Sequence, residues 1–315
     1  MKLSLIVPCY NEEANILPFY DEVYKTFKDK KYKVELIFIN DGSRDNTIKE
    51  LKKLIDKHDF EIKIVDFSRN FGKEAGMYAG MEHSTGDYVS IIDVDMQQPP
   101  KVVLEMLDIL EKDDDYDAVA AYQVKRKDSF LKKHFSNMFY KVINKVADVE
   151  LKSGASDFRL LRRNVVDSIL EVKEYYRFSK GIFSWVGFNT CYIEYEPLER
   201  ANGTTKWSLK KLFRYAFDGI LSYTTFPIKI ATIIGSILSL LSFIYLIVTV
   251  IQKLVFGIDV AGYASLLGVS LLLGGIQLLF LGVIGEYIAR IYIETKERPI
   301  YIARRIITND KVKKD

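Results

Sequence analysis

Residues 1–200 alternate between short apolar runs and stretches in which apolar residues recur at helical spacing. The apolar runs, which have the length of buried strands, are Leu3–Val7, Val34–Ile39, Ile62–Phe67, Tyr88–Ile92 and Ala118–Ala121. The intervening patterns predict helices over Ala14–Lys28, Thr47–His58, Lys73–His83 and Lys101–Glu111. Because strands that alternate with helices form mainly parallel sheets, this part of the chain is predicted to be an α/β domain.

Two later stretches, Ile230–Ile251 and Gly262–Gly285, contain no charged residue. As helices, both are long enough to cross the roughly 30 Å hydrocarbon core of a bilayer. Buried core helices are the alternative, but two such stretches joined by a short segment are typical of a transmembrane hairpin. Lysine and arginine residues gather on both outer flanks. The positive-inside rule therefore predicts both flanks in the cytoplasm and the joining segment outside.

A third pattern precedes the first span. In Ser208–Thr225, apolar residues recur at helical spacing with basic residues opposite, which favours a helix lying in the membrane interface. A helix packed on the α/β domain is the alternative, and Ser129–Ala147 has a similar pattern. The predicted organisation is a cytoplasmic α/β domain (1–207), an amphipathic juxtamembrane helix (208–227), a two-helix transmembrane hairpin (228–289) and a basic cytoplasmic tail (290–315).

The composition and the short N-terminal apolar run argue against several other kinds of protein. The net charge of +3 gives no reason to expect a nucleic-acid partner. Cys9 and Cys191 lie in unrelated contexts without the spacing of a zinc site. The apolar stretch at the N-terminus is too short for a signal peptide, so the first domain is expected in the cytoplasm.

Polar clusters follow the predicted strands, and ligands bind at the carboxyl ends of strands in parallel α/β sheets. Asp93 and Asp95 follow the strand Tyr88–Ile92, where both carboxylates can approach one point. Mg²⁺ or Mn²⁺ bound there, together with phosphate oxygens, would neutralise a diphosphate leaving group. Taken alone, this pattern is also compatible with a solvated turn. Asp41 follows an earlier strand and can accept a hydrogen bond from the N–H of a uracil or guanine base.

Four motifs together resemble the family 2 glycosyltransferases with a GT-A fold. They are Val7–Glu13, Asn40–Asp45, Ser68–Glu74 and Asp93–Gln97. Three later motifs resemble the branch of this family that glycosylates polyprenyl phosphates, which includes dolichol-phosphate mannosyltransferases and bactoprenol glucosyltransferases. They are Ser156–Leu160, Arg200–Ser208 and the segment from Gly285 to Tyr301. The two predicted spans are closer to the bactoprenol type, whereas Asn40 departs from a position at which the family often has Asp.

The resemblance implies a set of donor-site residues. Those that would hold the nucleoside are Pro8, Tyr10, Glu12 and Asp41. Those that would hold the metal and the diphosphate are Asp93, Asp95 and Gln97. Arg200 and Lys206, on either side of Gly203, would close over the nucleotide phosphates as a lid. Attraction to anionic lipid is the alternative role for these two cations.

The acceptor would need cations at the membrane face, because a lipid phosphate is dianionic. The residues that match the family's position for this site are Arg126, Lys132, Lys133 and Ser136. A solvated basic face is the alternative for each of them. Asp157 occupies the position of a catalytic carboxylate, but a phosphate monoester with a second pKa of about 6 is already an anion near neutral pH. A general base is therefore unnecessary, and the role of Asp157 stays open.

These residues predict an inverting transfer of a hexose or N-acetylhexosamine from a nucleotide sugar to undecaprenyl or another polyprenyl phosphate, for glycosylation of the cell envelope. The resemblance favours a UDP-sugar over a GDP-sugar and implies Mg²⁺ or Mn²⁺. The expected location is the cytoplasmic (inner) membrane, with homo-oligomerisation left open. The alternatives are a processive polysaccharide synthase and a catalytically silent membrane scaffold. No Q-x-x-R-W run supports the first, and the carboxylate set argues against the second.

Overall fold

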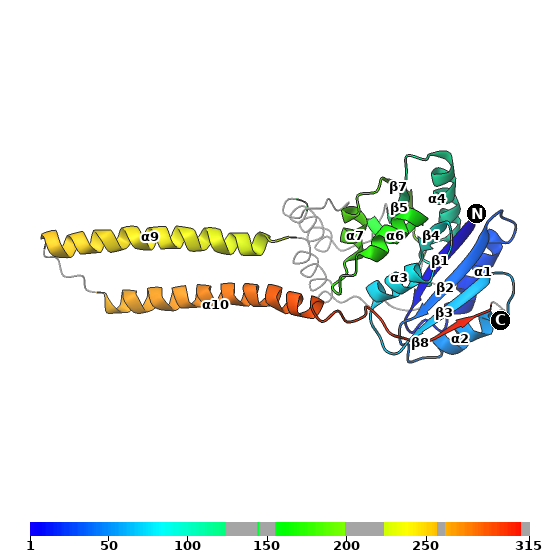
Figure 1. The fold of residues 1–315 in the computed structure, drawn as a ribbon, viewed down its shortest axis with the longest axis horizontal. Helices are drawn as coiled ribbons and strands as arrows, with labels where there is room; N and C mark the ends of the chain where they lie inside the picture. The colour runs from blue at the N-terminus through cyan, green and yellow to red at the C-terminus, as the bar shows by residue number, and fades with distance from the viewer. Residues whose placement is uncertain (124–143, 145–154, 199–223, 257–261, 310–315) are drawn as a thin grey trace.

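The structure, a computed structural model of the full chain, describes residues 1–123, 144, 155–198, 224–256 and 262–309. These residues form an α/β domain from which two long helices project (Figure 1). The strands are β1 (Lys2–Cys9), β2 (Lys33–Asn40), β3 (Glu61–Phe67), β4 (Tyr88–Ile91), β5 (Ala118–Gln123), β6 (Ala155–Arg162), β7 (Thr190–Tyr195) and β8 (Ala303–Thr308). The helices are α1 (Ile16–Phe27), α2 (Thr47–Leu54), α3 (Lys73–Glu82), α4 (Pro100–Lys112), α6 (Arg163–Glu171), α7 (Ser179–Trp185), α9 (Phe226–Phe256) and α10 (Tyr263–Glu294).

The described strands form one mixed sheet in the order β7-β5-β6-β4-β1-β2-β3-β8. The four central strands, β4, β1, β2 and β3, are parallel to their neighbours within this group. Their carboxyl ends therefore meet at one edge of the sheet, where α/β proteins bind ligands. The antiparallel strands β6 and β8 flank this group, β6 beside β4 and β8 beside β3. The predicted α/β fold with a mainly parallel centre is confirmed.

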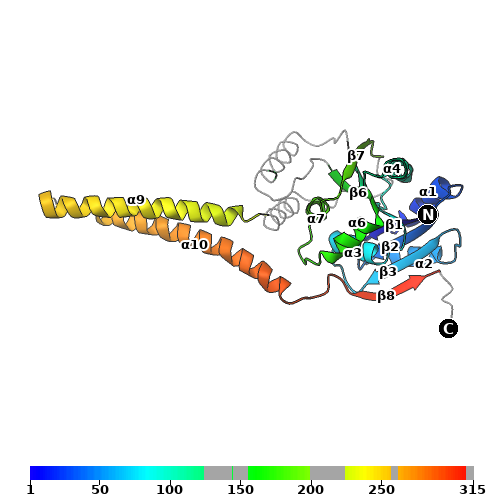
Figure 2. The ribbon, with the colours of Figure 1, turned by 45° about the horizontal axis from the view of Figure 1, so that its top comes forward.

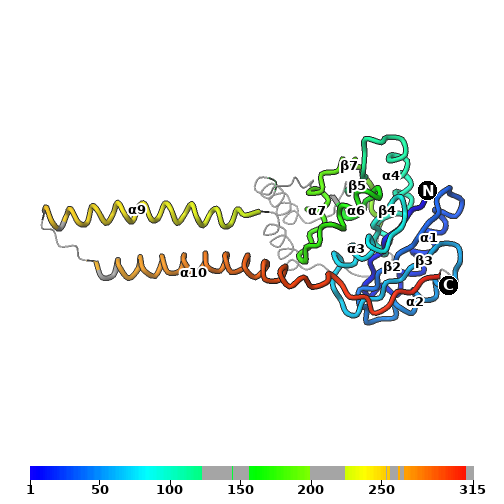
Figure 3. The backbone as a smooth tube through the Cα atoms, in the orientation of Figure 1, coloured from blue at the N-terminus to red at the C-terminus, as the bar shows by residue number. Residues whose placement is uncertain are grey.

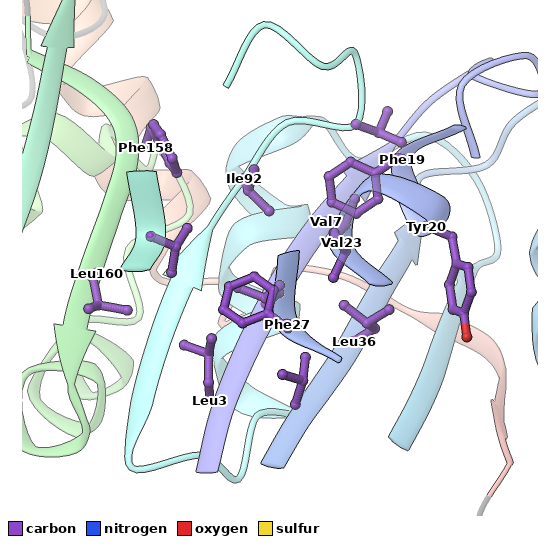
Figure 4. Close-up of a cluster of buried hydrophobic side chains, with 14 of the residues drawn as sticks. Leu3, Val7, Phe19, Tyr20, Val23, Phe27, Leu36, Ile92, Phe158 and Leu160 are labelled. Carbon is purple, nitrogen blue, oxygen red and sulfur yellow. The ribbon is translucent and has the colours of Figure 1, made fainter. Parts of the chain in front are cut away.

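Alternating strand residues fill two separate layers of core. Leu5 and Val7 of β1 pack in a cluster with α1, α2 and α4, whereas Ile6 packs with α3, α6 and α7 on the opposite face. The first cluster contains Phe19 of α1 in edge-on contact with Phe38 of β2, with ring centroids 6.2 Å apart. Figure 4 shows this layer over β1 and β2. Burial of each large apolar side chain contributes about 1.5–3 kcal/mol, so the central strands are firmly held.

Helices α9 and α10 run side by side away from the α/β domain (Figure 3). They contain spans of 27 residues (Phe226–Gln252) and 29 residues (Leu266–Glu294) that are long and apolar enough to cross a membrane. At a rise of 1.5 Å per residue each span is about 40 Å long. Most apolar side chains of both spans are exposed in the isolated chain, which is consistent with association with a membrane and argues against helices buried in the core of this chain.

The chain returns to the sheet after α10. Strand β8 pairs antiparallel with β3, with Ile64 opposite Ile307 and Lys63 opposite Thr308; Figure 2 shows it along the outer side of β3. This strand lies within the range 290–315, which is predicted above only as a basic cytoplasmic tail. The α/β domain is therefore built from two segments of chain, one on each side of the helical hairpin.

Several further elements of the sheet domain were not predicted, namely β6, β7, α6 and α7. The two predicted amphipathic helices, Ser129–Ala147 and Ser208–Thr225, lie almost wholly outside the described residues.

Candidate active site

Asp93 and Asp157 are brought together by strand register. Strand β4 pairs antiparallel with β6, and Ile91 lies opposite Arg159. Asp93 lies two residues after Ile91, just past the end of β4. Asp157 lies two residues before Arg159 on β6. The two carboxylates thus reach the same place from opposite directions, although they are far apart in the sequence.

A lysine joins these two carboxylates. The Nζ atom of Lys73 lies 2.8 Å from Oδ1 of Asp93 and 3.2 Å from Oδ2 of Asp157. Lys73 is the first residue of α3, where the helix dipole disfavours a cation. Burial works to lower the pKa of Lys73, but the charges of Asp93 and Asp157 raise it above its usual value. Its side chain is 38% exposed, so a ligand can reach this lysine.

The surroundings of Asp157 favour its ionised form. Burial works to raise the pKa of Asp157, yet the positive charges of Lys73, Lys180 and Arg159 lower it. Its Oδ1 atom is buried and has no hydrogen-bond partner among the described residues. A carboxylate held in its ionised form by cations is a weak base. The geometry places Asp157 in contact with Lys73, and its part in any reaction stays a prediction.

Gln98 orients the first of the two motif aspartates. Its Oε1 accepts the backbone N–H of Asp93 at 2.7 Å, and its Nε2 donates to Oδ2 of Asp93 at 3.1 Å. The Gln98 side chain is buried. The chain turns sharply at Met96, between Asp95 and Gln97, where φ is 64°. The backbone N–H of Gln97 donates to Oδ1 of Asp95 at 3.2 Å.

The donor set fits a divalent cation that shares its coordination with a ligand. The described part of the chain contains no cluster of three or more His, Cys, Asp or Glu side chains that would hold a metal alone. Asp93 and Asp95 supply carboxylate oxygens, which suit Mg²⁺ or Mn²⁺ when phosphate oxygens and water complete the shell. A cation, the ammonium of Lys73, already lies against Asp93, which shows that this position attracts positive charge.

Asp41 lies at the carboxyl end of β2, as the sequence predicts. Its Oδ1 accepts the backbone N–H of Phe71 at 2.6 Å, and its Oδ2 accepts that of Gly72 at 3.0 Å. Burial raises the pKa of Asp41 to about 6, and the two backbone donors only partly offset this. The carboxylate therefore fixes the turn between β3 and α3, and contact with a base remains a prediction.

The loops after β1 and β2 are tied together by direct hydrogen bonds. The backbone N–H of Asn11 donates to Oγ of Ser43 at 3.0 Å, and Oδ1 of Asn11 accepts the N–H of Arg44 at 2.8 Å. Glu12 donates its N–H to Oγ1 of Thr47 at 2.8 Å. The structure thus brings the predicted nucleoside residues to one edge of the sheet, in β1 (Pro8), in the loop after it (Tyr10 and Glu12) and after β2 (Asp41).

Glu74 contacts the segment that links this site to the end of α10. Its carboxylate accepts both the backbone N–H and the hydroxyl of Ser179, the first residue of α7. Burial, followed by the charge of Asp157, raises the pKa of Glu74 to about 7. Just before α7, the backbone N–H of Tyr175 donates to Oε1 of Glu294 at the end of α10, at 2.9 Å.

Sequence reasoning missed three residues of this site, namely Lys73, Glu74 and Gln98. The first two belong to the quoted motif Ser68–Glu74, and a lysine in the first turn of a helix is a signal because it opposes the dipole. Six other predicted residues lie outside the described part of the chain: Arg126, Lys132, Lys133, Ser136, Arg200 and Lys206.

Comparison with known proteins gives consistent matches over nearly the whole chain. The sequence matches the family "Glycosyl transferase family 2" over residues 4–170 and the "GtrB C-terminal hairpin" over residues 226–291. The putative glycosyltransferase CsbB of Bacillus subtilis is 44% identical over 302 residues, which cover 96% of this chain and 91% of the relative. The bactoprenol glucosyl transferase of Shigella phage SfV is 42% identical over 313 residues, covering 99% and 100%. Among solved structures, glucosyl-3-phosphoglycerate synthase from Mycobacterium tuberculosis with Mn²⁺, UDP and glucosyl-3-phosphoglycerate has a TM-score of 0.47 at 17% identity, covering 70% of this chain and 77% of that one.

Proposed function

Because this chain belongs to glycosyl transferase family 2 and is a glycosyltransferase, we propose that it transfers one hexose or N-acetylhexosamine from a nucleotide sugar to a polyprenyl phosphate. A relative of matching length is named a bactoprenol glucosyl transferase, which supports a polyprenyl phosphate carrier as acceptor. The donor is proposed to be a UDP-sugar.

The observation that carries this proposal is the connection between the apolar hairpin and the candidate site. Glu294 at the end of α10 contacts the backbone of Tyr175, and Ser179 in the same segment contacts Glu74 beside Lys73. The site therefore adjoins the point at which the hairpin leaves the membrane, where a lipid phosphate would present its headgroup. A sugar acceptor dissolved in the cytosol would not require this arrangement.

The same contacts support a topology for the hairpin. The hydroxyl of Tyr287 on α10 donates to the backbone oxygen of Thr224, just before α9, at 2.8 Å. The chain thus enters and leaves the hairpin on the side of the α/β domain, and β8 completes the sheet on that side. Together with the basic flanks, this supports a cytoplasmic catalytic domain at the inner membrane.

The chemistry follows from the charges of the site. In an in-line displacement, a lipid phosphate oxygen would form a bond to the anomeric carbon while the bond from that carbon to the nucleoside diphosphate breaks, with inversion. Asp93 and Asp95, with Gln97, would hold a divalent ion, which supplies positive charge to the departing diphosphate. Lys73 adds a second positive charge beside Asp93. Asp157 keeps that lysine in place, and the dianionic acceptor needs no general base.

Residues outside the described part would complete the site in this proposal. Arg126, Lys132, Lys133 and Ser136 are proposed to bind the lipid phosphate. Arg200 and Lys206 are proposed to close over the phosphates of the nucleotide.

The test is a donor panel with the purified full-length chain. The protein is mixed with undecaprenyl phosphate, Mg²⁺ or Mn²⁺ and one of UDP-glucose, UDP-N-acetylglucosamine, UDP-galactose or GDP-mannose, and the lipid fraction is analysed by mass. We expect one sugar per lipid from a UDP donor, and no product after chelation of the metal. Absence of a lipid-linked sugar from every donor would contradict the proposal. A ladder of products with several sugars would favour a processive synthase instead.

A further inference from the structure

The segment that follows the membrane hairpin lies along the nucleoside side of the site. Tyr301 stacks on Phe67 at the end of β3, with ring centroids 4.9 Å apart. The backbone oxygen of Ile302 accepts the N–H of Ser68 at 2.9 Å, and Arg304 donates to the backbone oxygen of Ser68 at 3.2 Å. The loop after β3 is thus supported by residues that come after both membrane helices.

One ion pair extends from this segment into the sheet. Nε of Arg305 donates to Oδ2 of Asp66 on β3 at 2.8 Å. The other oxygen of Asp66, Oδ1, accepts Nδ2 of Asn40 on β2 at 2.7 Å. Asp66 and Asn40 are both buried, at 4% and 2% exposure. Hydrogen bonds of this kind, in which a buried carboxylate lies between a cation and an amide, are among the stronger ones in proteins.

Asn40 carries this connection to the loop of Asp41. Its backbone oxygen accepts the N–H of Gly42 at 2.9 Å, and its side-chain oxygen faces the N–H of Ser43 at 3.4 Å. The amide of Asn40 therefore faces Asp66 on one side and the loop Asn40–Ser43 on the other. An amide suits this position because Oδ1 of Asp66 accepts a hydrogen bond here, and the carboxylate of an aspartate at position 40 would not donate one. This accounts for an asparagine where the family often has an aspartate.

We propose that Arg305 is a positioning residue for the nucleoside diphosphate part of the donor. Through Asp66 and Asn40 it holds the loop Asn40–Ser43 in the conformation that binds the nucleoside. This inference rests on the proposed function in so far as the ligand is a nucleotide sugar. It also gives the strand after the hairpin a role in donor binding, at a distance from the acceptor.

The first experiment compares Arg305→Gln with Lys52→Gln in the full-length protein. Lys52 is an exposed cation on α2, outside the motifs quoted above, so its loss serves as the control. We expect Arg305→Gln to weaken the binding of UDP with Mg²⁺ about fivefold to tenfold by calorimetry, and to raise KM for the UDP-sugar by the same factor. The value of kcat and the KM for polyprenyl phosphate should stay within about twofold. A role in stability alone would lower the Tm and leave the Kd of UDP unchanged, which would overturn the inference.

The second experiment exchanges the two buried partners. Asn40→Asp places a carboxylate against Asp66, so we expect UDP binding to weaken about tenfold or more. Adding Asp66→Asn should restore it to within about threefold, because the new amide can point its oxygen at Arg305 and its NH₂ at the new carboxylate. Failure of the second change to restore binding would overturn the inference.

The two proposals fail in different ways. A wild-type protein that binds UDP but makes no lipid-linked sugar would contradict the proposed function, while the UDP-binding comparison would still test Arg305. A wild-type protein that binds no nucleoside diphosphate would overturn the inference about Arg305 as well.

Discussion

The two halves of the site use their carboxylates in opposite ways. At the ends of β2 and β3, Asp41 accepts two backbone N–H groups and forms no ion pair with the residues that the structure describes. Burial raises its pKa to about 6, although the two backbone donors and the charge of Arg69 act in the opposite direction. At the ends of β4 and β6, Lys73 lies between Asp93 and Asp157, and positive charges lower the pKa of Asp157 in spite of its burial.

The difference shows which half is built before a ligand arrives. Around Asp41 the loops are held by hydrogen bonds within the protein. This half, which is proposed to bind the nucleoside and is called the nucleoside half below, therefore takes its shape during folding. Around Asp93 and Asp157 the charges of Lys73, Lys180 and Arg159 offset those of the carboxylates, and this balance would change if a cation or a diphosphate bound there. We therefore expect substitutions in the first half to change stability or the affinity for the nucleotide, and substitutions in the second half to change turnover.

The largest expected effect is that of Asp95→Asn in the half around Asp93. In the proposed mechanism Asp95 helps to hold the divalent ion at the departing diphosphate, so its loss should lower kcat/KM on the order of 10²–10³-fold. The Tm should stay close to that of the wild type, since the change is nearly isosteric. The measurement is the rate of lipid-linked sugar formation, with Asp56→Asn, an exposed position on another part of the domain, as the control. Full transfer activity in Asp95→Asn would show that this carboxylate is not needed for transfer, whereas a silent scaffold would form no lipid-linked sugar in either protein and would keep its cellular role after the change.

Lys73→Met tests the lysine that joins the two carboxylates. Without its ammonium, Asp93 and Asp157 lose a shared hydrogen-bond donor. A hydrogen bond to a charged group contributes about 1.5–3 kcal/mol. We expect kcat/KM to fall on the order of tenfold to 10²-fold. Lys53→Met removes an exposed ion pair with Glu50 on α2, which contributes about 0–1 kcal/mol, and should leave turnover unchanged. Equal turnover in the two variants would show that Lys73 has no part in transfer.

Gly42→Ala tests the nucleoside half. The φ of Gly42 is +62°, and an added Cβ would lie 2.4 Å from the backbone carbon of Arg69 and 2.5 Å from the nitrogen of Asn70. Backbone atoms cannot move aside cheaply, so we expect a loss of about 1–3 kcal/mol of stability, measured as a lower Tm. Gly76→Ala is the matched control, because its Cβ would meet Pro8 at an ordinary 3.6 Å and alanine favours a helix by about 0.5–1 kcal/mol. A Gly42→Ala protein as stable as the wild type would contradict this account of the loop.

The smallest effect concerns pH. Because folding raises the pKa of Asp41 from 3.8 to about 6, the folded protein binds more protons at this site than the unfolded chain between about pH 4 and pH 6. The contribution of Asp41 to stability therefore falls as the pH rises through this window. This contribution is absent in Asp41→Asn. On going from pH 4.5 to pH 6.5, the Tm of Asp41→Asn should therefore fall less, or rise more, than the Tm of the wild type. An identical pH dependence in both proteins would contradict the raised pKa.

The central sheet and the position of the site could be predicted from the sequence because both depend on local patterns. Strands β1 to β4 are nearly continuous apolar runs, and their predicted ends lie within two residues of those observed. In a parallel group these ends share one edge, which is where Asp41 and Asp93 lie. The prediction that Asp93 and Asp95 follow a strand end is confirmed, whereas metal binding stays a prediction.

The remaining contacts depend on pairings that no local pattern reveals. Asp157 meets Asp93 only because β6 is antiparallel to β4 in one particular register. Lys73 stands in a quoted motif, but its partners come from two other strands. Strand β8, Ala303–Thr308, includes two adjacent arginines and is short, so it resembles a tail in sequence. Its pairing with β3 is a long-range contact across the whole hairpin.

The position of β8 in the chain also sets the order in which the protein can be completed. During synthesis, β1 to β7 are made first, and the outer edge of β3 stays without its partner until both apolar helices have been made. An unpaired strand edge is a site for association with other chains. Completion of the sheet domain therefore depends on synthesis of both apolar helices, and a version shortened after α7 or β7 to remove these helices would also lose the strand that pairs with β3.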